Sequence, residues 1–461
     1  MKKTISYIRF LAFFSSFSIL LVAVSAKAQL ADLKQEKYKL KNGLQVVFME
    51  YGNLPVTSFH FYVNTGKKNE TPGMQNISEF TSQALLFGNA KYSHSQIDSI
   101  SALMGSRVSA TANDNFTQVS MDVLNSDVDM GMDMFAAIIT QPTFPKDEID
   151  EMIQQTNDFN NTSKMDITDL GAVYSNYFVF GTGNPLGRHF YPAQLKKMGV
   201  AEIKEFYNFN FTPKNTILVV SGKPDKEKMK QLISKYFDGW QAAYGEVNGV
   251  DFGAPDISKK EYAFVNRDNA VQAALNWTKK GPSVDSKDVF AFQIANNAFN
   301  EMIFNQVREK EGKTYGIGSR FSVDENTGVY TISTLVRNEV MYATTHSVDK
   351  VLTDFYTNGI TEEQLNTIKV IIKNRFLGAE TPDDIVGYFN PLLYPDFEKR
   401  KAALQAIDNI TLEQVNKAVK KYFTPDSYKL VIAGNETELA PQLANIKSLI
   451  KIPLKAIEAD N

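Results

Sequence analysis

The sequence contains no cysteine, and this absence removes several kinds of chemistry at once. Thiol catalysis, cysteine-ligated metal sites, disulfide stabilisation and a lipid anchor on an N-terminal cysteine are all excluded. Stability must therefore come from buried apolar cores. With 43% hydrophobic residues among 461, the chain has enough apolar material for two or more domains.

Histidine is nearly as scarce. The chain has four histidines, at positions 60, 94, 189 and 346, and no two of them lie within 30 residues of each other. A local motif with two imidazoles on one face of a helix is therefore absent. Single histidines in a chain of this size are usually structural or surface residues, and a metal site assembled from distant histidines is left open as an alternative.

Long apolar runs are absent after residue 28. Before it, a positively charged start precedes an apolar stretch from Phe10 to Val24, and Ala26-Lys27-Ala28 has the small-x-small pattern of a cleavage site. The stretch is shorter than a membrane-spanning helix requires, so residues 1–28 are predicted to be a secretory signal peptide. We expect an exported, periplasmic protein with no transmembrane segment after cleavage.

Positively charged residues are slightly fewer than negatively charged ones. Residues 1–28 hold four of the 49 Lys and Arg and none of the 52 Asp and Glu, which leaves a formal net charge of −7 on the rest. Because binding to phosphates depends on clustered positive charge, nucleic acid is not an expected partner.

What the sequence does contain is an internal repeat. Residues 212–222 read TPKNTILVVSG and residues 424–434 read TPDSYKLVIAG, with Thr, Pro, Leu, Val and Gly at the same offsets. Each copy predicts an amphipathic helix, a Thr-Pro break and a buried strand. The two copies begin at residues 212 and 424. A spacing of this length indicates two related domains, predicted at residues 29–240 and 260–461 and joined by a Gly- and Pro-rich linker at 241–259.

The remaining patterns predict mixed α/β halves, each with an antiparallel-rich sheet and helices, which is an α+β fold class. An Asn-Gly turn inside YKLKNGLQVVFME predicts a hairpin. The main predicted helices span residues 77–87, 95–105, 127–140, 146–160, 287–309, 340–358 and 361–377.

The order of these segments resembles the pitrilysin/insulinase family of zinc metallopeptidases, which share their fold with mitochondrial processing peptidases. The resemblance rests on NTGKKNETPGMQNISEFTSQALLFGNAKYS, QPTFPKDEI, NPLGR and, most specifically, VREKEGKTYGIGS. It implies zinc held by an inverted H-x-x-E-H motif and a later glutamate, with the motif glutamate acting as general base.

In this chain the motif is degenerate. Alignment on Leu-Phe-Gly places Glu79, Ser82 and Gln83 at the three motif positions, so both imidazoles and the base are replaced. The later glutamate should fall near residues 157–159, where Asp158 is the carboxylate, more typical of a solvated helix residue than of a ligand. We expect no zinc or other cofactor on this chain and no catalytic residue of its own.

A second family feature is retained. The family carries an arginine and a tyrosine, seven residues apart, that reach over the zinc site, and Arg308 and Tyr315 have that spacing. A guanidinium can grip peptide carbonyls, and a phenol can donate to an oxyanion. Gly312 and Gly316 would let the backbone turn tightly here. A charged helix end followed by an ordinary strand aromatic would give the same pattern, so this alternative is open.

Some members of the family work as two chains, one with zinc and one with the Arg–Tyr pair. The resemblance therefore implies the second kind: inactive alone, and supplying Arg308 and Tyr315 to a zinc-bearing partner chain during peptide hydrolysis. Peptide is expected to add along a sheet edge, near Ala110–Asn113 here. A stand-alone peptide-binding protein, a structural role and a peptidase with an unseen metal site are the alternatives.

Overall fold

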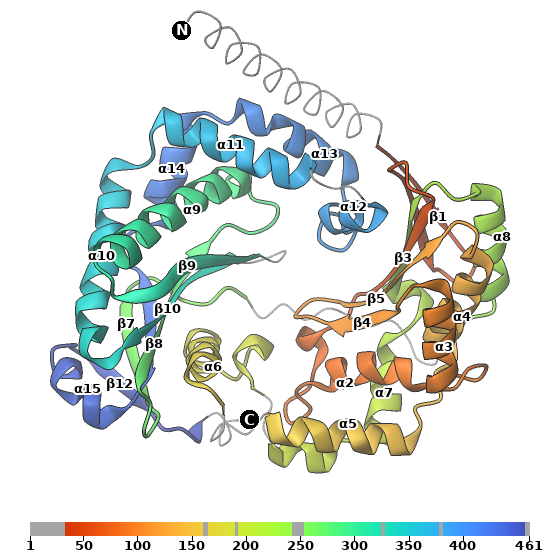
Figure 1. Cartoon of the computed structure of the whole chain (residues 1–461), viewed down its shortest axis with the longest axis horizontal. Helices are drawn as coiled ribbons and strands as arrows, with labels where there is room; N and C mark the ends of the chain where they lie inside the picture. Colours follow the sequence, from red (N-terminus) through yellow and green to blue (C-terminus); the bar gives the residue numbers. More distant parts are fainter. Residues whose placement is uncertain are drawn as a thin grey trace, which may run out of the picture.

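The computed structural model describes residues 33–159, 165–189, 192–241, 253–323, 328–377 and 381–456. The predicted signal peptide and residues 242–252 of the predicted linker lie outside the described residues. The described part of the chain forms two six-stranded sheets with helices, one sheet in each half of the sequence (Figure 1). The predicted fold class is confirmed.

The first sheet has the strand order β1-β2-β6-β3-β5-β4. Only β2 and β6 pair in parallel, and the other neighbours are antiparallel. The strands are β1 (Lys34–Lys39), β2 (Gln45–Glu50), β3 (Val56–Val63), β4 (Ser109–Ala112), β5 (Thr117–Leu124) and β6 (Thr216–Gly222).

The second sheet has the order β12-β7-β11-β8-β10-β9. Here β11 and β12 both run parallel to β7, and the other pairs are antiparallel. The strands are β7 (Lys260–Asn266), β8 (Gln272–Gly281), β9 (Thr314–Val323), β10 (Gly328–Arg337), β11 (Tyr428–Gly434) and β12 (Leu449–Ile452).

The repeated segments form the same element in both sheets. Strands β6 and β11 each lie between a parallel and an antiparallel neighbour. Leu218 of β6 pairs with Phe61, and its counterpart Leu430 of β11 pairs with Trp277. Helices α7 (Val200–Asn210) and α14 (Leu412–Tyr422) end three residues before Pro213 and Pro425. Because proline disfavours helical backbone at the residue before it, neither helix continues through this segment.

Helices cover the outer face of each sheet (Figure 1). In the first half these are α2 (Ile77–Ala84), α3 (His94–Met104), α4 (Val128–Thr140), α5 (Lys146–Phe159), α7 (Val200–Asn210) and α8 (Lys226–Phe237). In the second half they are α9 (Val289–Phe304), α10 (Met341–Asn358), α11 (Glu362–Leu377), α14 (Leu412–Tyr422) and α15 (Glu436–Leu443).

Two further helices are exchanged between the halves. Helix α6 (Ile167–Phe180) follows the first five strands in sequence but packs on β8 and β11 of the second sheet. Helix α12 (Pro382–Tyr388), from the second half, packs on β3 and β6 of the first sheet. Figure 1 shows both helices on the sides of the sheets that face the middle of the molecule. The predicted domain limits, 29–240 and 260–461, place α6 in the first domain and α12 in the second, whereas each helix packs on the sheet of the opposite half.

Both exchanged helices are held by apolar contacts. Leu170 and Tyr174 of α6 are fully buried in a cluster with residues of β7, β8 and β11. Ile385 and Val386 of α12 are buried against the first sheet, in a cluster that also includes apolar side chains of α13 (Phe397–Gln405). Gly171 faces β8 so closely that a Cβ there would lie 2.8 Å from Nδ2 of Asn276. The halves therefore share their cores.

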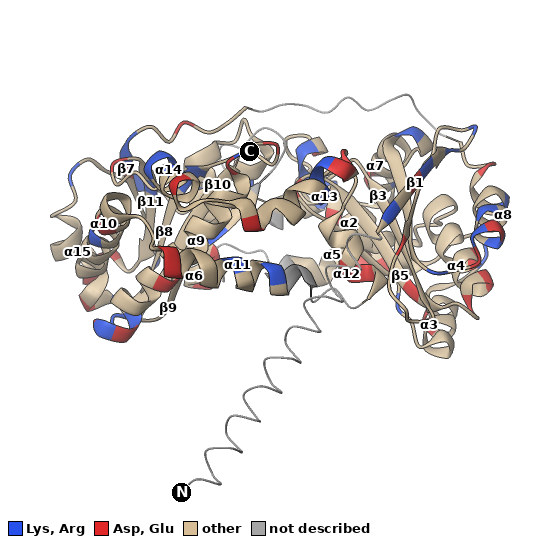
Figure 2. Cartoon of the chain, turned by 90° about the horizontal axis from the view of Figure 1, so that it is seen from above, with Lys and Arg blue, Asp and Glu red and all other residues tan. Residues whose placement is uncertain are grey.

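Charged residues of both signs are intermingled over the two halves (Figure 2). Among the described helices, none combines the length and the apolar character that crossing a bilayer requires.

Candidate functional site

Helix α2 carries the three positions of the degenerate motif, and their side chains bond to one another and to nearby backbone. Glu79 Oε1 accepts from Nε2 of Gln83 at 2.7 Å, the i,i+4 neighbour on the helix. Ser82 donates its hydroxyl to the carbonyl of Glu79 at 2.8 Å. Glu79 Oε2 accepts from the backbone N–H of Ala112 at 2.9 Å. The site is a small hydrogen-bonded cluster that joins α2 to strand β4.

This donor set does not fit zinc. The ion prefers imidazole nitrogen, thiolate or carboxylate, usually four ligands in a tetrahedron. Here one carboxylate stands alone, both of its oxygens accept hydrogen bonds, and its neighbours are an amide and a hydroxyl. Asp158 belongs to α5, and its side chain lies outside the described residues. Within the described ranges no group of three His, Cys, Asp or Glu residues is arranged to hold a metal ion.

Helix α2 is fixed at its start by a buried carboxylate. Glu70 accepts from the backbone N–H groups of Asn76 and Ser78, at 3.0 and 3.2 Å, and from the Ser78 hydroxyl. Burial raises the pKa of Glu70, and these hydrogen bonds oppose the rise. Gly66 opens the same turn, and a Cβ there would lie 2.2 Å from the carbonyl oxygen of Asn113. The turn thus sets α2 against the end of β4.

Strand β4 is an edge strand, as the expected peptide-binding edge near Ala110–Asn113 requires. It pairs with β5 on one side and ends the first sheet on the other. This edge is not fully available to a peptide, because the backbone N–H of Ala112 already donates to Glu79 of α2.

Arg308 and Tyr315 lie on the second sheet. Arg308 belongs to η6 (Asn305–Lys310), a stretch of π-helix that continues α9. Its Nε donates to the carbonyl oxygen of Tyr315 at 2.8 Å, its guanidinium lies 5.0 Å from the centre of the Phe304 ring, and Glu309 pairs with it. The structure therefore brings the two residues together through the backbone of Tyr315 rather than through its phenol.

Tyr315 sits on a β-bulge of the edge strand β9. Thr314 pairs with Val336 and Ile317 with Thr334, so Tyr315 and Gly316 together face Leu335 alone. Bulges of this kind commonly redirect a side chain next to functional sites. The Tyr315 side chain is 91% exposed.

Two threonine hydroxyls hold the bulge. Thr334 Oγ1 donates to Thr314 Oγ1 at 2.9 Å, and Thr314 Oγ1 is 2.8 Å from the carbonyl of Leu335 and accepts from the N–H of Gly316 at 3.1 Å. Neither threonine stood out in the sequence, because the bulge that makes them neighbours depends on strand register.

The expected glycine turn is present at one of its two positions. Gly312 has φ +62°, in the left-handed region that favours glycine, and its N–H donates to the carbonyl of Arg308 at 3.1 Å, which ends the helix. Gly316 is outside that region, so its role is in the bulge instead.

The hydrogen bonds of Glu79 stay within the first half and those of Arg308 within the second. A contact between the two halves that sequence reasoning missed involves His60 of β3. Its Nε2 lies 3.1 Å from Oδ1 of Asp383 on the exchanged helix α12, and this contact lowers the pKa of Asp383. The two residues are far apart in sequence, so no local pattern could have paired them.

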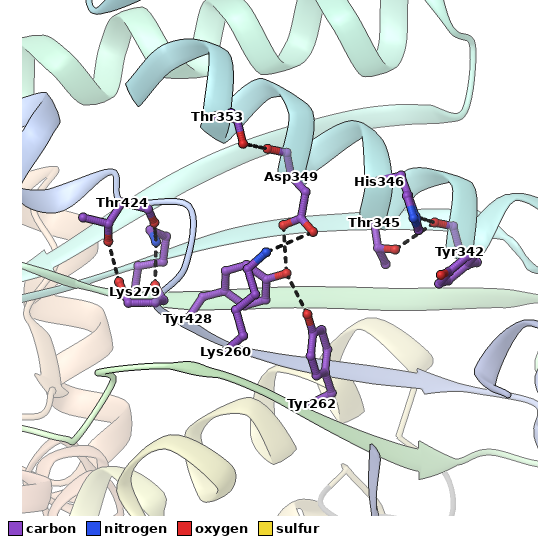
Figure 3. Close-up of polar contacts among 11 residues, drawn as sticks. Lys260, Tyr262, Lys279, Tyr342, Thr345, His346, Asp349, Thr353, Thr424 and Tyr428 are labelled. Atoms are coloured by element: carbon purple, nitrogen blue, oxygen red, sulfur yellow. Dashed lines mark hydrogen bonds and ion pairs between the residues drawn. The ribbon is translucent and has the colours of Figure 1, made fainter. Parts of the chain in front are cut away.

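A second missed feature is a buried lysine in the second sheet (Figure 3). Lys279 of β8 donates from Nζ to the carbonyls of Thr424 and Ser427, both at 2.6 Å. Burial and the positive charge of Lys260 lower the pKa of Lys279 to about 7. Beside it, the hydroxyl of Tyr428 donates to Asp349 at 2.8 Å (Figure 3). The cluster fixes the turn before β11.

Two family models match the sequence. Residues 46–177 match the insulinase model, peptidase family M16, and residues 197–371 match the peptidase M16 inactive domain. Among curated proteins, the chain is 21% identical to the uncharacterized zinc protease YmxG of Bacillus subtilis, over 85% of this chain and 96% of that protein. It is 22% identical to the zinc protease PqqE of Helicobacter pylori, over 81% of this chain and 86% of that protein.

Solved structures show the same fold. A peptidase M16 inactive domain from Pseudomonas fluorescens superposes with a TM-score of 0.79 at 20% identity, covering 87% of this chain and 98% of that one. The periplasmic protease PqqL of Escherichia coli gives a TM-score of 0.77 at 16% identity, covering 88% of this chain and 47% of that one.

Proposed function

Because the chain belongs to the pitrilysin/insulinase (M16) peptidase family, we propose that it is the subunit of a two-chain peptidase that binds no zinc itself. It is inactive alone and supplies Arg308 and Tyr315 to a zinc-bearing chain of the same family during peptide hydrolysis. It is exported to the periplasm by residues 1–28, in line with the periplasmic location of the similar protease PqqL.

The observation that carries this proposal is an asymmetry between the two sites. At the degenerate motif, Glu79, Ser82 and Gln83 use their polar groups on each other and on β4. At the other site, the phenol of Tyr315 projects into solvent at 91% exposure, from a backbone that Arg308 and two threonines hold in place. A phenol presented in this way can donate to an oxyanion that develops on a second molecule.

The Arg308 side chain does not extend freely into solvent, because it packs against its own half of the molecule. Its Nε is committed to the carbonyl of Tyr315, and the guanidinium rests on the Phe304 ring. The Arg308 side chain is 40% exposed, and one of its remaining N–H groups bonds to Glu309, which peptide carbonyls could replace. Arg308 thus orients Tyr315 and also offers donors to substrate.

The test is co-purification with a zinc-bearing M16 chain from the same cell, followed by a peptide cleavage assay. The mixture is expected to cleave, and this chain alone is not. Tyr315→Phe removes only the hydroxyl and should lower the kcat of the mixture by roughly 100-fold, the usual effect of losing one oxyanion donor. Arg308→Ala should lower kcat and raise KM.

Arg320→Ala is the matched control, because Arg320 is an exposed arginine on the same strand β9. It should leave the rate of the mixture unchanged. A mixture that cleaves equally well with the Tyr315→Phe variant would remove the site assignment, and chelator-sensitive cleavage by this chain alone would overturn the proposal as a whole. A chain that binds peptide but changes no partner's activity would instead be a stand-alone binding protein.

A further inference from the structure

The open edge of strand β4 has few backbone groups to offer an incoming strand. In the β4–β5 hairpin, Asn113 donates its N–H to the carbonyl of Phe116, and neighbouring pairs in an antiparallel ladder alternate between bonded and non-bonded. Ala112 opposite Thr117, and Ala110 opposite Val119, are therefore the non-bonded pairs. Their N–H and C=O groups point away from β5, toward the edge where a peptide would add.

Glu79 takes one of these two outward amides. Its Oε2 lies 2.9 Å from the N of Ala112, where the carbonyl oxygen of an added strand would otherwise accept. Gln83 holds the other carboxylate oxygen at 2.7 Å, and the two side chains come from one face of α2, which packs directly on β4. A carboxylate acceptor makes a stronger bond to a backbone N–H than a peptide carbonyl does.

The consequence for strand addition follows from the spacing. An added strand bonds to every second residue of the edge, and β4 spans only Ser109–Ala112, so Ala110 and Ala112 are the two points of attachment within the strand. With Ala112 occupied, a single residue is left, which is too little to hold a peptide by main-chain bonds.

We propose that Glu79, held by Gln83, is a built-in competitor that closes the edge of β4 to peptides. The position that aligns with the first zinc ligand of the family has become an internal cap of the strand. This inference rests on the proposed function and deepens it: the substrate lies on the edge strand of the zinc-bearing partner, and this chain contributes Arg308 and Tyr315 but holds no peptide on its own edge.

The direct test is amide hydrogen exchange at Ala112, measured residue by residue on the full chain without a partner. In the wild type, Ala112 should exchange slowly for an edge position. Glu79→Ala should speed its exchange roughly 10- to 100-fold, the range expected for losing a hydrogen bond to a charged group. Glu79→Gln keeps an oxygen acceptor and should retain most of the protection.

Ser82→Ala is the matched control, since Ser82 lies on the same helix and, among the residues that the structure describes, its hydroxyl bonds to the carbonyl of Glu79 and not to Ala112. It should leave the exchange of Ala112 unchanged. If Glu79→Ala and Ser82→Ala alter it equally, or if neither does, Glu79 is not a cap and the inference fails.

Peptide binding supplies the second readout. A fluorescein-labelled insulin B chain should bind the Glu79→Ala variant at least 10-fold more tightly than the wild type, because the competitor is gone. Equal affinity for both proteins contradicts closure of the edge. Both measurements use this chain alone, so they are independent of the cleavage assay: an inactive mixture with fast exchange in Glu79→Ala refutes the two-chain function and leaves the cap standing.

Discussion

Lys279 gives the most direct test of the buried polar chemistry in the second sheet, through the substitution Lys279→Met. The pKa of this lysine is lowered from 10.5 to about 7, first by burial and then by the charge of Lys260. Between these values the unfolded chain binds a proton at this position that the folded chain lacks, so the stability of the wild type rises with pH. Each pH unit contributes about 1.4 kcal/mol once the folded lysine is fully deprotonated.

From pH 7 to pH 9 the lysine should therefore add about 2.3 kcal/mol to the free energy of unfolding, because the folded lysine is still half protonated at the start of this range. Lys279→Met removes the titrating group and with it this rise. The variant also loses two hydrogen bonds to the carbonyls of Thr424 and Ser427, worth roughly 1 kcal/mol each, but that loss is the same at both pH values. The difference in slope is the quantity that isolates the lysine.

The assay is urea unfolding followed by tryptophan fluorescence. Trp277 is fully buried on β8, two residues before Lys279, and Trp240 lies in the first half, so a Trp240→Phe background makes the signal report the second sheet. Lys280→Met is the control, an exposed lysine one residue along the same strand. If Lys279→Met and Lys280→Met show the same pH dependence as the parent, the buried lysine does not titrate as argued.

Two further substitutions test other parts of the structure. Thr334→Val removes the hydroxyl that donates to Thr314, so the amide of Gly316 in the bulge should exchange roughly 2- to 10-fold faster. Ser322→Ala on strand β9 is the control. An unchanged exchange rate in Thr334→Val would mean that the bulge is held without the Thr334 hydroxyl. Burial and the charge of Lys67 lower the pKa of His189 to about 4, so the unfolded chain binds the proton first and stability falls as the pH drops below about 6.5. His189→Gln should reduce this loss by up to about 3 kcal/mol between pH 6.5 and 4, measured as the shift in urea midpoints, and a loss identical to that of the wild type would contradict the assignment.

The regular elements were predictable because their signals are local. The seven predicted helices are present, and the repeated Thr-Pro segments precede the central strands β6 and β11. The hairpin expected around Asn42-Gly43 is also there, with Gly43 at φ +99°. Apolar periodicity and proline both act over a few residues, so a single sequence contains them.

The features that position the candidate site depend on contacts across the chain. The bond from Glu79 to Ala112 joins a helix to a strand that the sequence separates by 33 residues. The bulge under Tyr315 appears only when β9 is set in register against β10. Helix α6 has the composition of any buried helix, and nothing in its residues says which sheet it will cover.

The exchanged helices bear on how the proposed site is completed. Each sheet is covered on its inner side by a helix from the other half, and the clusters around Leu170 and Val386 bury apolar side chains from both. Separating the two halves would expose both clusters to water, at about 25 cal/mol per Å² of apolar surface. Large relative movement of the halves is therefore unfavourable. On the motif helix α2 of the same chain, Glu79, Ser82 and Gln83 already hydrogen-bond to one another and to β4. On the proposed function, the zinc and the edge strand that hold the scissile peptide come from a second chain, and Tyr315 of this chain reaches the peptide there.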